Sequence, residues 1–267
     1  MQVRAGTSGF SYKEWKGSFY PASLSPSEYL SHYSSRLPAV EINSTFYRMP
    51  RSEVVASWFD QTPDDFRFVL KGSRRITHQQ RLQNSADSVA YLFKVAAILQ
   101  HKLGPVLFQL PPNLRKDVSR LENFLALLPD GFRAALEFRH PSWHDDEVFD
   151  VLRRHQAALC CGDETDSWQR IEPTTSWGYL RLRGESYPPA SLDDWAARIE
   201  AQPWTEAFVF FKHEENGPVL AEALLGRCAP RPGLARAAAP LAHPPRKASA
   251  DSEPAGNRAR RKRREVG

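Results

Sequence analysis

The chain of 267 residues is long enough for one large α/β domain or two small ones, and its 41% hydrophobic and 11% aromatic residues are typical of a globular protein. Its net charge of +5 is unevenly spread, because residues 227–267 hold 11 of the 36 Lys and Arg residues but only three of the 31 Asp and Glu residues. Residues 1–226 therefore carry a net charge of −3, which excludes a generally basic surface on that part.

Eight segments have the apolar, β-branched composition of short strands, and a helical pattern follows nearly every one of them. In chain order, the expected strands cover residues 3–7, 39–47, 66–72, 105–110, 134–139, 157–162, 177–183 and 207–212. The expected helices cover residues 25–36, 52–61, 86–102, 119–128, 148–155, 192–201 and 218–225. Ser25 and Ser119 are each followed by Glu three residues later, which predicts a capping box at the start of two helices.

This alternation predicts a (β/α)8 TIM barrel over residues 1–226. The link 163–176 has no apolar helical stripe, so the sixth helix is expected to be missing or degenerate. An open doubly wound sheet is the alternative, but the first turn, Gly6-Thr7-Ser8-Gly9, lacks the spacing of a dinucleotide-binding loop.

After the last expected helix the composition changes. Residues 227–267 contain no Phe, Trp or Tyr and are dominated by Ala, Pro and Arg. Such a segment cannot bury enough apolar surface to offset its ordering entropy, which predicts a disordered basic tail.

The three cysteines form neither a metal-binding spacing nor a disulfide framework. Cys160 and Cys161 lie side by side in an apolar strand and are expected to be inert core thiols. The sequence shows no apolar signal segment and no run that approaches a membrane span. We therefore expect a cytoplasmic protein with no membrane partner.

Polar side chains recur in strands whose two faces should both be covered in an α/β protein. Alternation puts three polar pairs on common inward faces: Glu41 with Asn43, Glu137 with Arg139, and Arg181 with Arg183. Their neighbours Leu136, Phe138, Leu180 and Leu182 should face the helices. Further polar or aromatic residues at or after strand ends are Tyr47, Lys71, Gln109, His140, Trp143 and Asp163. Because strand ends and the loops after them line the active face of a barrel, these residues should converge on one site.

The expected cluster sets Glu41 and Glu137 against a larger number of Lys and Arg side chains. An excess of fixed cations suits an anionic ligand, a phosphate or a carboxylate. Glu41, Glu137 and His140 are the candidates for acid–base catalysis. The candidates for substrate binding are Asn43, Tyr47, Lys71, Gln109, Arg139, Trp143, Arg181 and Arg183. A structural ion-pair network that closes the top of the barrel is the alternative.

A divalent metal is a second alternative. Glu41, Glu137, His140, Asp163 and His213 carry suitable oxygen and nitrogen ligands. Nearby Lys and Arg side chains would repel a cation, so no cofactor is expected.

These residues together predict an enzyme, a hydrolase, lyase or isomerase, that acts on a small anionic metabolite by acid–base chemistry or hydrolysis. The other class to consider is a nucleic-acid-binding or nucleic-acid-processing protein that uses loop aromatics and the basic tail. Glu41 is expected to be ionised and to face the barrel interior. If the cleft there is open to water, Glu41→Gln should cost little stability and abolish function.

Several motifs, in order, resemble those of domain-of-unknown-function family 72, the YecE-like proteins. The matching stretches are Gly6-Thr7-Ser8-Gly9-Phe10-Ser11-Tyr12 with Trp15, Val40-Glu41-Ile42-Asn43-Ser44-Thr45-Phe46-Tyr47 with Pro50, Lys71 with Thr77-His78, Gln109-Leu110-Pro111-Pro112, Glu137-Phe138-Arg139-His140-Pro141-Ser142-Trp143, Tyr179-Leu180-Arg181-Leu182-Arg183-Gly184 and Val209-Phe210-Phe211. The resemblance covers about residues 3–225. It implies a TIM barrel with the matched polar residues around one cleft, and it leaves the reaction open.

Overall fold

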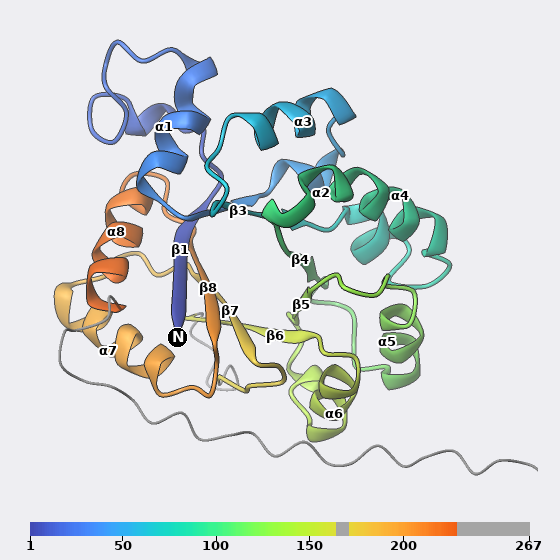
Figure 1. The fold of residues 1–267 in the computed structure, drawn as a ribbon. Helices are drawn as coiled ribbons and strands as arrows, with labels where there is room; N and C mark the ends of the chain where they lie inside the picture. Colours follow the sequence, from blue (N-terminus) through green and yellow to red (C-terminus); the bar gives the residue numbers. More distant parts are fainter. Residues whose placement is uncertain (164–170, 229–267) are drawn as a thin grey trace, which may run out of the picture. The chain divides into compact units, whose positions relative to one another are not determined.

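The computed structural model describes residues 1–163 and 171–228, which form a closed barrel of parallel strands (Figure 1). The strands are β1 Gln2–Ser8, β2 Ala39–Ile42, β3 Arg67–Lys71, β4 Leu103–Gln109, β5 Ala134–Glu137, β6 Ala158–Gly162, β7 Trp177–Leu182 and β8 Glu206–Phe211. Neighbours in sequence are neighbours in the sheet, and β1 pairs with β8 to close the ring. The predicted (β/α)8 barrel is confirmed.

Helices lie outside the ring of strands (Figure 1). They are α1 Tyr29–Arg36, α3 Ser52–Asp60, α4 Ala86–Ala96, α5 Val118–Leu125, α6 Asp146–Arg154, α7 Pro189–Glu200 and α8 Gly217–Cys228, with a single-turn helix α2 Ser44–Tyr47 after β2. None of the helices in the described ranges is both long and apolar enough to cross a membrane.

The two faces of each strand have different packing partners. Inward-facing side chains form one buried cluster: Ala39, Val69, Leu107, Ala135, Ala158, Cys160, Trp177, Tyr179, Phe208 and Phe210. The outward-facing Leu136, Phe138, Leu180 and Leu182 pack in the clusters beneath the helices, as expected from alternation. Cys160 and Cys161 are both buried, and burial raises the pKa of each thiol. Glu41 pairs in register with Val69, and Arg181 with Phe210, so both belong to the inward layer.

The strand expected over residues 39–47 is shorter than predicted. It ends at Ile42, and Ser44–Tyr47 turn into α2. Two features account for this turn. The β2–β3 pairing ends at Ile42 and Leu70. The Thr45 Oγ1 atom lies 2.8 Å from the carbonyl oxygens of both Ile42 and Lys71. A hydroxyl that bonds nearby backbone competes with continuation of the sheet ladder.

Of the two predicted capping boxes, the one at Ser25 is present and the one at Ser119 is not. Glu28 accepts hydrogen bonds from Ser25, which confirms the first capping box. The second is wrong, because α5 starts one residue earlier and Asp117 accepts the hydrogen bond from Arg120 N at 3.0 Å. Aspartate is as good an N-cap as serine, and it precedes Ser119 in the chain.

Two expectations fall wholly or partly outside the described residues. In the link after β6, Asp163 and residues 171–176 form no helix, and residues 164–170 are not described. The expected tail begins inside α8, which continues to Cys228, and residues 229–267 are not described.

Candidate functional site

Arg181 on β7 joins two carboxylates at the carboxyl end of the barrel. Its Nη2 lies 2.7 Å from Glu41 Oε1 on β2, and its Nη1 lies 2.8 Å from Glu137 Oε2 on β5. All three side chains are buried, and Glu41 has no exposed surface. Burial opposes the charge of Arg181, but the two carboxylates raise its pKa well above the usual value. Arg181 is therefore a permanent cation held in a fixed position.

Glu41 accepts from three donors on two strands, β1 and β7. Besides Arg181, the Ser8 hydroxyl donates to Oε1 at 2.7 Å and the Tyr179 hydroxyl donates to Oε2 at 2.6 Å. Burial and the neighbouring carboxylate raise the pKa of Tyr179, so the phenol stays protonated and remains a donor. Because the carboxylate is fully paired and inaccessible, the geometry favours a role for Glu41 in positioning Arg181.

Glu137 connects this buried layer with the surface of the barrel end. Its Oε1 accepts from Arg139 and, at 2.9 Å, from Arg183 Nη2, while Oε2 accepts from Arg181. The side chains of Arg139 and Arg183 are 16% and 15% exposed, so both can reach solvent from a fixed base. Asp163 fixes the backbone beside them by accepting from the N–H groups of Arg183 and Gly184 and from the Tyr187 hydroxyl.

Lys71 has no carboxylate partner among the described residues. Its Nζ, at the end of β3, donates to Gln109 Oε1 at 2.8 Å and lies 4.6 Å from the centre of the Phe46 ring. Arg181 Nη1 approaches the same Gln109 oxygen at 3.3 Å. Burial and the charge of Arg181 lower the pKa of Lys71 to about 8, although Glu41 and Glu137 act in the opposite direction.

His78 was not among the predicted site residues and appeared in the sequence only within the family-like stretch Thr77-His78. It lies on a π-helical turn, Arg75–Gln79, and its ring packs edge-on against Phe46 at 5.0 Å, centre to centre. Thr77 Oγ1 lies 2.9 Å from His78 Nδ1. Burial and the charge of Lys71 lower the pKa of His78, which favours a neutral imidazole. Single π turns are frequent at functional sites, but no simple sequence pattern distinguishes them.

A cleft of about 680 Å³ opens beside this network, over the ends of β7 and β8. Its lining residues are Glu14, Arg183, Gly184, Glu185, Lys212, His213, Glu214 and Glu215. Arg183 therefore belongs both to the wall of the cleft and to the ion-pair network.

The structure brings together seven of the eleven predicted site residues: Glu41, Glu137, Lys71, Gln109, Arg139, Arg181 and Arg183. Asn43 directly follows β2, and its Oδ1 is buried without a hydrogen bond in the described structure. His140 caps the turn Pro141–Trp143, where Nδ1 accepts from Ser142 N at 3.1 Å.

Trp143 and Tyr47 do not belong to this network. Trp143 is fully buried under the helices, stacks on Phe138 with ring centres 4.8 Å apart, and donates from Nε1 to the Leu114 carbonyl. Its predicted role as a substrate-binding residue does not fit this position, because Trp143 has no exposed surface. Tyr47 is 72% exposed at the end of α2, where its ring contacts Phe46.

The five residues considered as metal ligands do not converge. Within residues 1–163 and 171–228, no three His, Cys, Asp or Glu side chains lie close enough to hold a metal ion. Arg181 lies between Glu41 and Glu137, and His213 contacts the Glu185 carbonyl at 3.2 Å.

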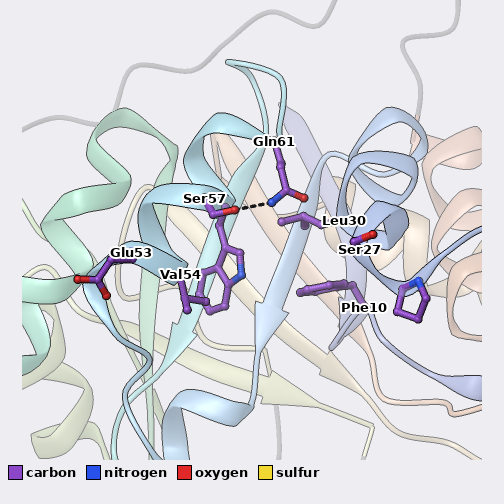
Figure 2. A pocket seen from close by; sticks show the side chains of 9 residues that line it. Phe10, Ser27, Leu30, Glu53, Val54, Ser57 and Gln61 are labelled. Atoms are coloured by element: carbon purple, nitrogen blue, oxygen red, sulfur yellow. Dashed lines mark hydrogen bonds between the residues drawn. The ribbon is translucent and has the colours of Figure 1, made fainter.

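A second pocket, of about 330 Å³, lies on the outside of the barrel between α1 and α3 (Figure 2). Phe10, Leu30 and Val54 line it, and Glu53 is its one charged residue. Gln61 donates to the Ser57 hydroxyl at 2.6 Å along its edge. This apolar groove contains no cluster of groups suited to acid–base chemistry.

Comparisons with known proteins agree with the fold and the motifs. The model of the family described as "Protein of unknown function DUF72" matches residues 4–244. The chain is 36% identical to UPF0759 protein YecE of Escherichia coli K12 over 115 residues, 43% of this chain and 42% of that protein, so the match spans less than half of that relative. It is 28% identical to UPF0759 protein YunF of Bacillus subtilis 168, covering 75% of this chain and 86% of that protein. The crystal structure of a DUF72 family protein from Thermotoga maritima superposes with a TM-score of 0.70 and 26% identity, covering 84% of this chain and 97% of that one.

Proposed function

Because the chain belongs to the family described as protein of unknown function DUF72, whose description names no reaction, we propose a function from the site itself: an enzyme that acts on a small anionic metabolite. The substrate occupies the carboxyl ends of the barrel strands, where TIM-barrel enzymes have their active sites.

The observation that carries the proposal is a continuous series of contacts from the open cleft to Lys71. It runs from Arg183 through Glu137, Arg181 and Gln109 to Lys71, with each contact between 2.8 and 3.3 Å. Arg183 and Arg139 present guanidinium groups whose positions are fixed by Glu137. Fixed, partly exposed guanidinium groups are well suited to hold a carboxylate or phosphate.

Lys71 is the acid–base group of this site. With a pKa of about 8 it exchanges a proton near neutral pH, as a general acid or base must. Glu41 and Glu137 act as positioning residues, because their oxygens are already bound by guanidinium and hydroxyl donors. This assignment replaces their expected role as catalytic carboxylates.

The negative charges on the rim of the cleft favour a small ligand over a nucleic acid. Four carboxylates, Glu14, Glu185, Glu214 and Glu215, line the cleft around Arg183 and Lys212. A phosphodiester backbone that followed this rim would meet repeated like charges, whereas a small molecule can place one anionic group on the guanidinium groups.

Thermal shift with inorganic phosphate and with small carboxylates tests the proposal. A ligand that binds only the folded chain raises the free energy of unfolding by about 2.7 kcal/mol at a hundredfold excess over Kd. We expect at least one of these anions to raise the melting temperature, and Arg183→Gln to remove that rise. Arg133→Gln is the matched control, because Arg133 pairs with Glu206 at the amino end of the strands. An equal rise in both variants, or none in the wild type, would contradict the proposal.

A further inference from the structure

Lys71 differs in its partners from the three buried cations of the described barrel, Arg4, Lys102 and Arg181. Arg181 binds two carboxylates, Arg4 pairs with Glu206 at 2.5 Å, and Lys102 donates to two backbone carbonyls and lies 3.7 Å from Asp64. Lys71 has only neutral partners in the part of the chain that the structure describes: one amide oxygen and one aromatic face. A desolvated ammonium without an anion is costly, so this site favours the neutral amine.

A permanent cation stands next to that amine. Lys71 Nζ and Arg181 Nη1 both approach Gln109 Oε1, at 2.8 and 3.3 Å. Since Arg181 is fixed by Glu41 and Glu137, it cannot move away when Lys71 is protonated. Desolvation combined with a neighbouring cation is the arrangement that activates lysine as a nucleophile.

We propose that Lys71 is a carbonyl-reactive amine, whose Nζ forms an imine with a small aldehyde or ketone that carries a carboxylate or phosphate. The neutral amine attacks the carbonyl carbon, a C–N bond forms, and the carbonyl π electrons move to oxygen. One amine proton passes to that oxygen to give a carbinolamine, and the hydroxyl then leaves as water with the second amine proton as the C=N bond forms. This inference rests on the proposed function, in which Arg183 and Arg139 hold the anionic group of the same molecule.

The surrounding residues support a nucleophile better than a carboxylate base. Both oxygens of Glu41 and of Glu137 already accept from charged or hydroxyl donors. An imine provides the electron sink for bond cleavage next to the former carbonyl carbon, and it needs only the amine. Phe46 covers Lys71, and its ring also contacts His78, so an aromatic face shields the amine from water on that side.

Reductive trapping tests the proposal. The full-length protein is incubated with glyoxylate and cyanoborohydride, which reduces an iminium ion to a stable secondary amine, and peptide mass spectrometry then locates the carboxymethyl group. With a pKa of about 8, the neutral fraction of Lys71 at pH 7.5 is roughly two-hundredfold above that of an ordinary lysine. We expect Lys71 to be labelled at least about tenfold faster than any other lysine. Labelling spread over surface lysines, or an unlabelled Lys71, would overturn the proposal.

Two variants and a pH series control the experiment. Lys71→Arg should lose the fast labelling, while Lys94→Arg, which changes an exposed lysine on α4, should retain it. The rate should rise with a midpoint near pH 8. The groups that face Lys71 and set this midpoint are Arg181, Glu41, Glu137, Lys212 and His78. A midpoint near that of exposed lysines contradicts the proposal.

Phosphate binding, measured on the same protein, separates this inference from the proposed function. Selective labelling of Lys71 without any anion-dependent stabilisation supports the amine and refutes the anion site. Stabilisation by phosphate that depends on Arg183, without selective labelling, refutes the amine and leaves the anion site intact.

Discussion

Charged residues at the carboxyl end of the barrel differ in how completely each charge is compensated. Glu41 accepts from three donors, whereas the Lys71 ammonium meets an amide oxygen and a ring. A charge that is fully paired and buried maintains geometry, and a charge with neutral partners can lose its proton near neutral pH. Variants at these two positions should therefore affect stability in opposite directions.

Glu41→Gln should destabilise the protein by about 3–5 kcal/mol, because it leaves the buried Arg181 with one carboxylate instead of two. From the sequence alone the expected loss of stability was small, because a cleft open to water would solvate the cation that Glu41 leaves behind. The Glu41 side chain has no exposed surface, so the larger loss is expected. Denaturant unfolding at neutral pH measures the difference.

Tyr179→Phe is the matched control for this variant. It removes one donor to Glu41 but keeps the ion pair with Arg181. The loss should be about 1.5–3 kcal/mol, the range for a hydrogen bond to a charged group. Glu41→Gln would contradict the positioning role if it were as stable as the wild type.

Lys71→Met should stabilise the protein at pH 7, by about 1–3 kcal/mol, since each pKa unit corresponds to about 1.4 kcal/mol and the pKa falls from 10.5 to about 8. Below pH 8 the folded wild type carries a desolvated charge that the variant lacks. Between about pH 8 and 10.5 only the unfolded chain binds the proton, so the wild type gains stability as pH rises and the difference shrinks.

Thermal unfolding of the two proteins at pH 7 and pH 10 measures this trend. Lys94→Met, at an exposed position on α4, provides the control and should show no gain. A Lys71→Met protein less stable than the wild type at pH 7 would mean that the ammonium has a favourable partner.

The N-terminal cap of α5 is Asp117 in the structure, whereas the sequence pattern predicted Ser119. Asp117→Ala should cost about 1 kcal/mol, because Asp117 accepts from Arg120 N and pairs with the Arg120 guanidinium at 3.1 Å. Ser119→Ala should be neutral or slightly stabilising, since the exposed Ser119 lies within the helix, where Ala has the higher propensity. Urea unfolding of both variants tests this, and the reverse order would restore the capping box at Ser119.

The order of strands and the face of each strand residue were predictable, because period-2 alternation and strand–helix repetition are local properties of the sequence. Thus Glu41, Glu137 and Arg181 were correctly placed inside the barrel. Their pairing was not predictable, because Glu41 and Arg181 are 140 residues apart and their contact depends on register around the closed ring.

Loop residues illustrate a second limit. Trp143 and Tyr47 both follow strands, and an aromatic side chain there fits a core lid as well as a ligand site. Trp143 stacks on the outward-facing Phe138 and is buried with it beneath the helices. Strand β2 ends early, and α2 then leaves the ring of Tyr47 exposed.

Helix α8 completes the described barrel. It packs on β1 and β8, and Ala221 and Leu224 on its inner side are fully buried. Arg227, near its end, pairs with Asp193 on α7 at 2.7 Å. The positive charge of the sequence is concentrated beyond this helix, whereas the cleft rim carries four glutamates.

A chain that ends at Cys228 should therefore unfold in one cooperative transition, within a few degrees of the full chain, and keep its anion-induced thermal shift. A chain that ends before Gly217 should not fold, since it lacks the buried face of α8.

The full chain should bind duplex DNA with an affinity that falls steeply with salt, because each neutralised phosphate releases counterions, and the chain that ends at Cys228 should not bind. Salt-sensitive DNA binding by residues 1–228 would place the nucleic-acid site on the barrel and contradict the argument from the acidic rim. A large loss of stability would instead show that residues after 228 contribute to the fold, in line with a family match that extends to residue 244.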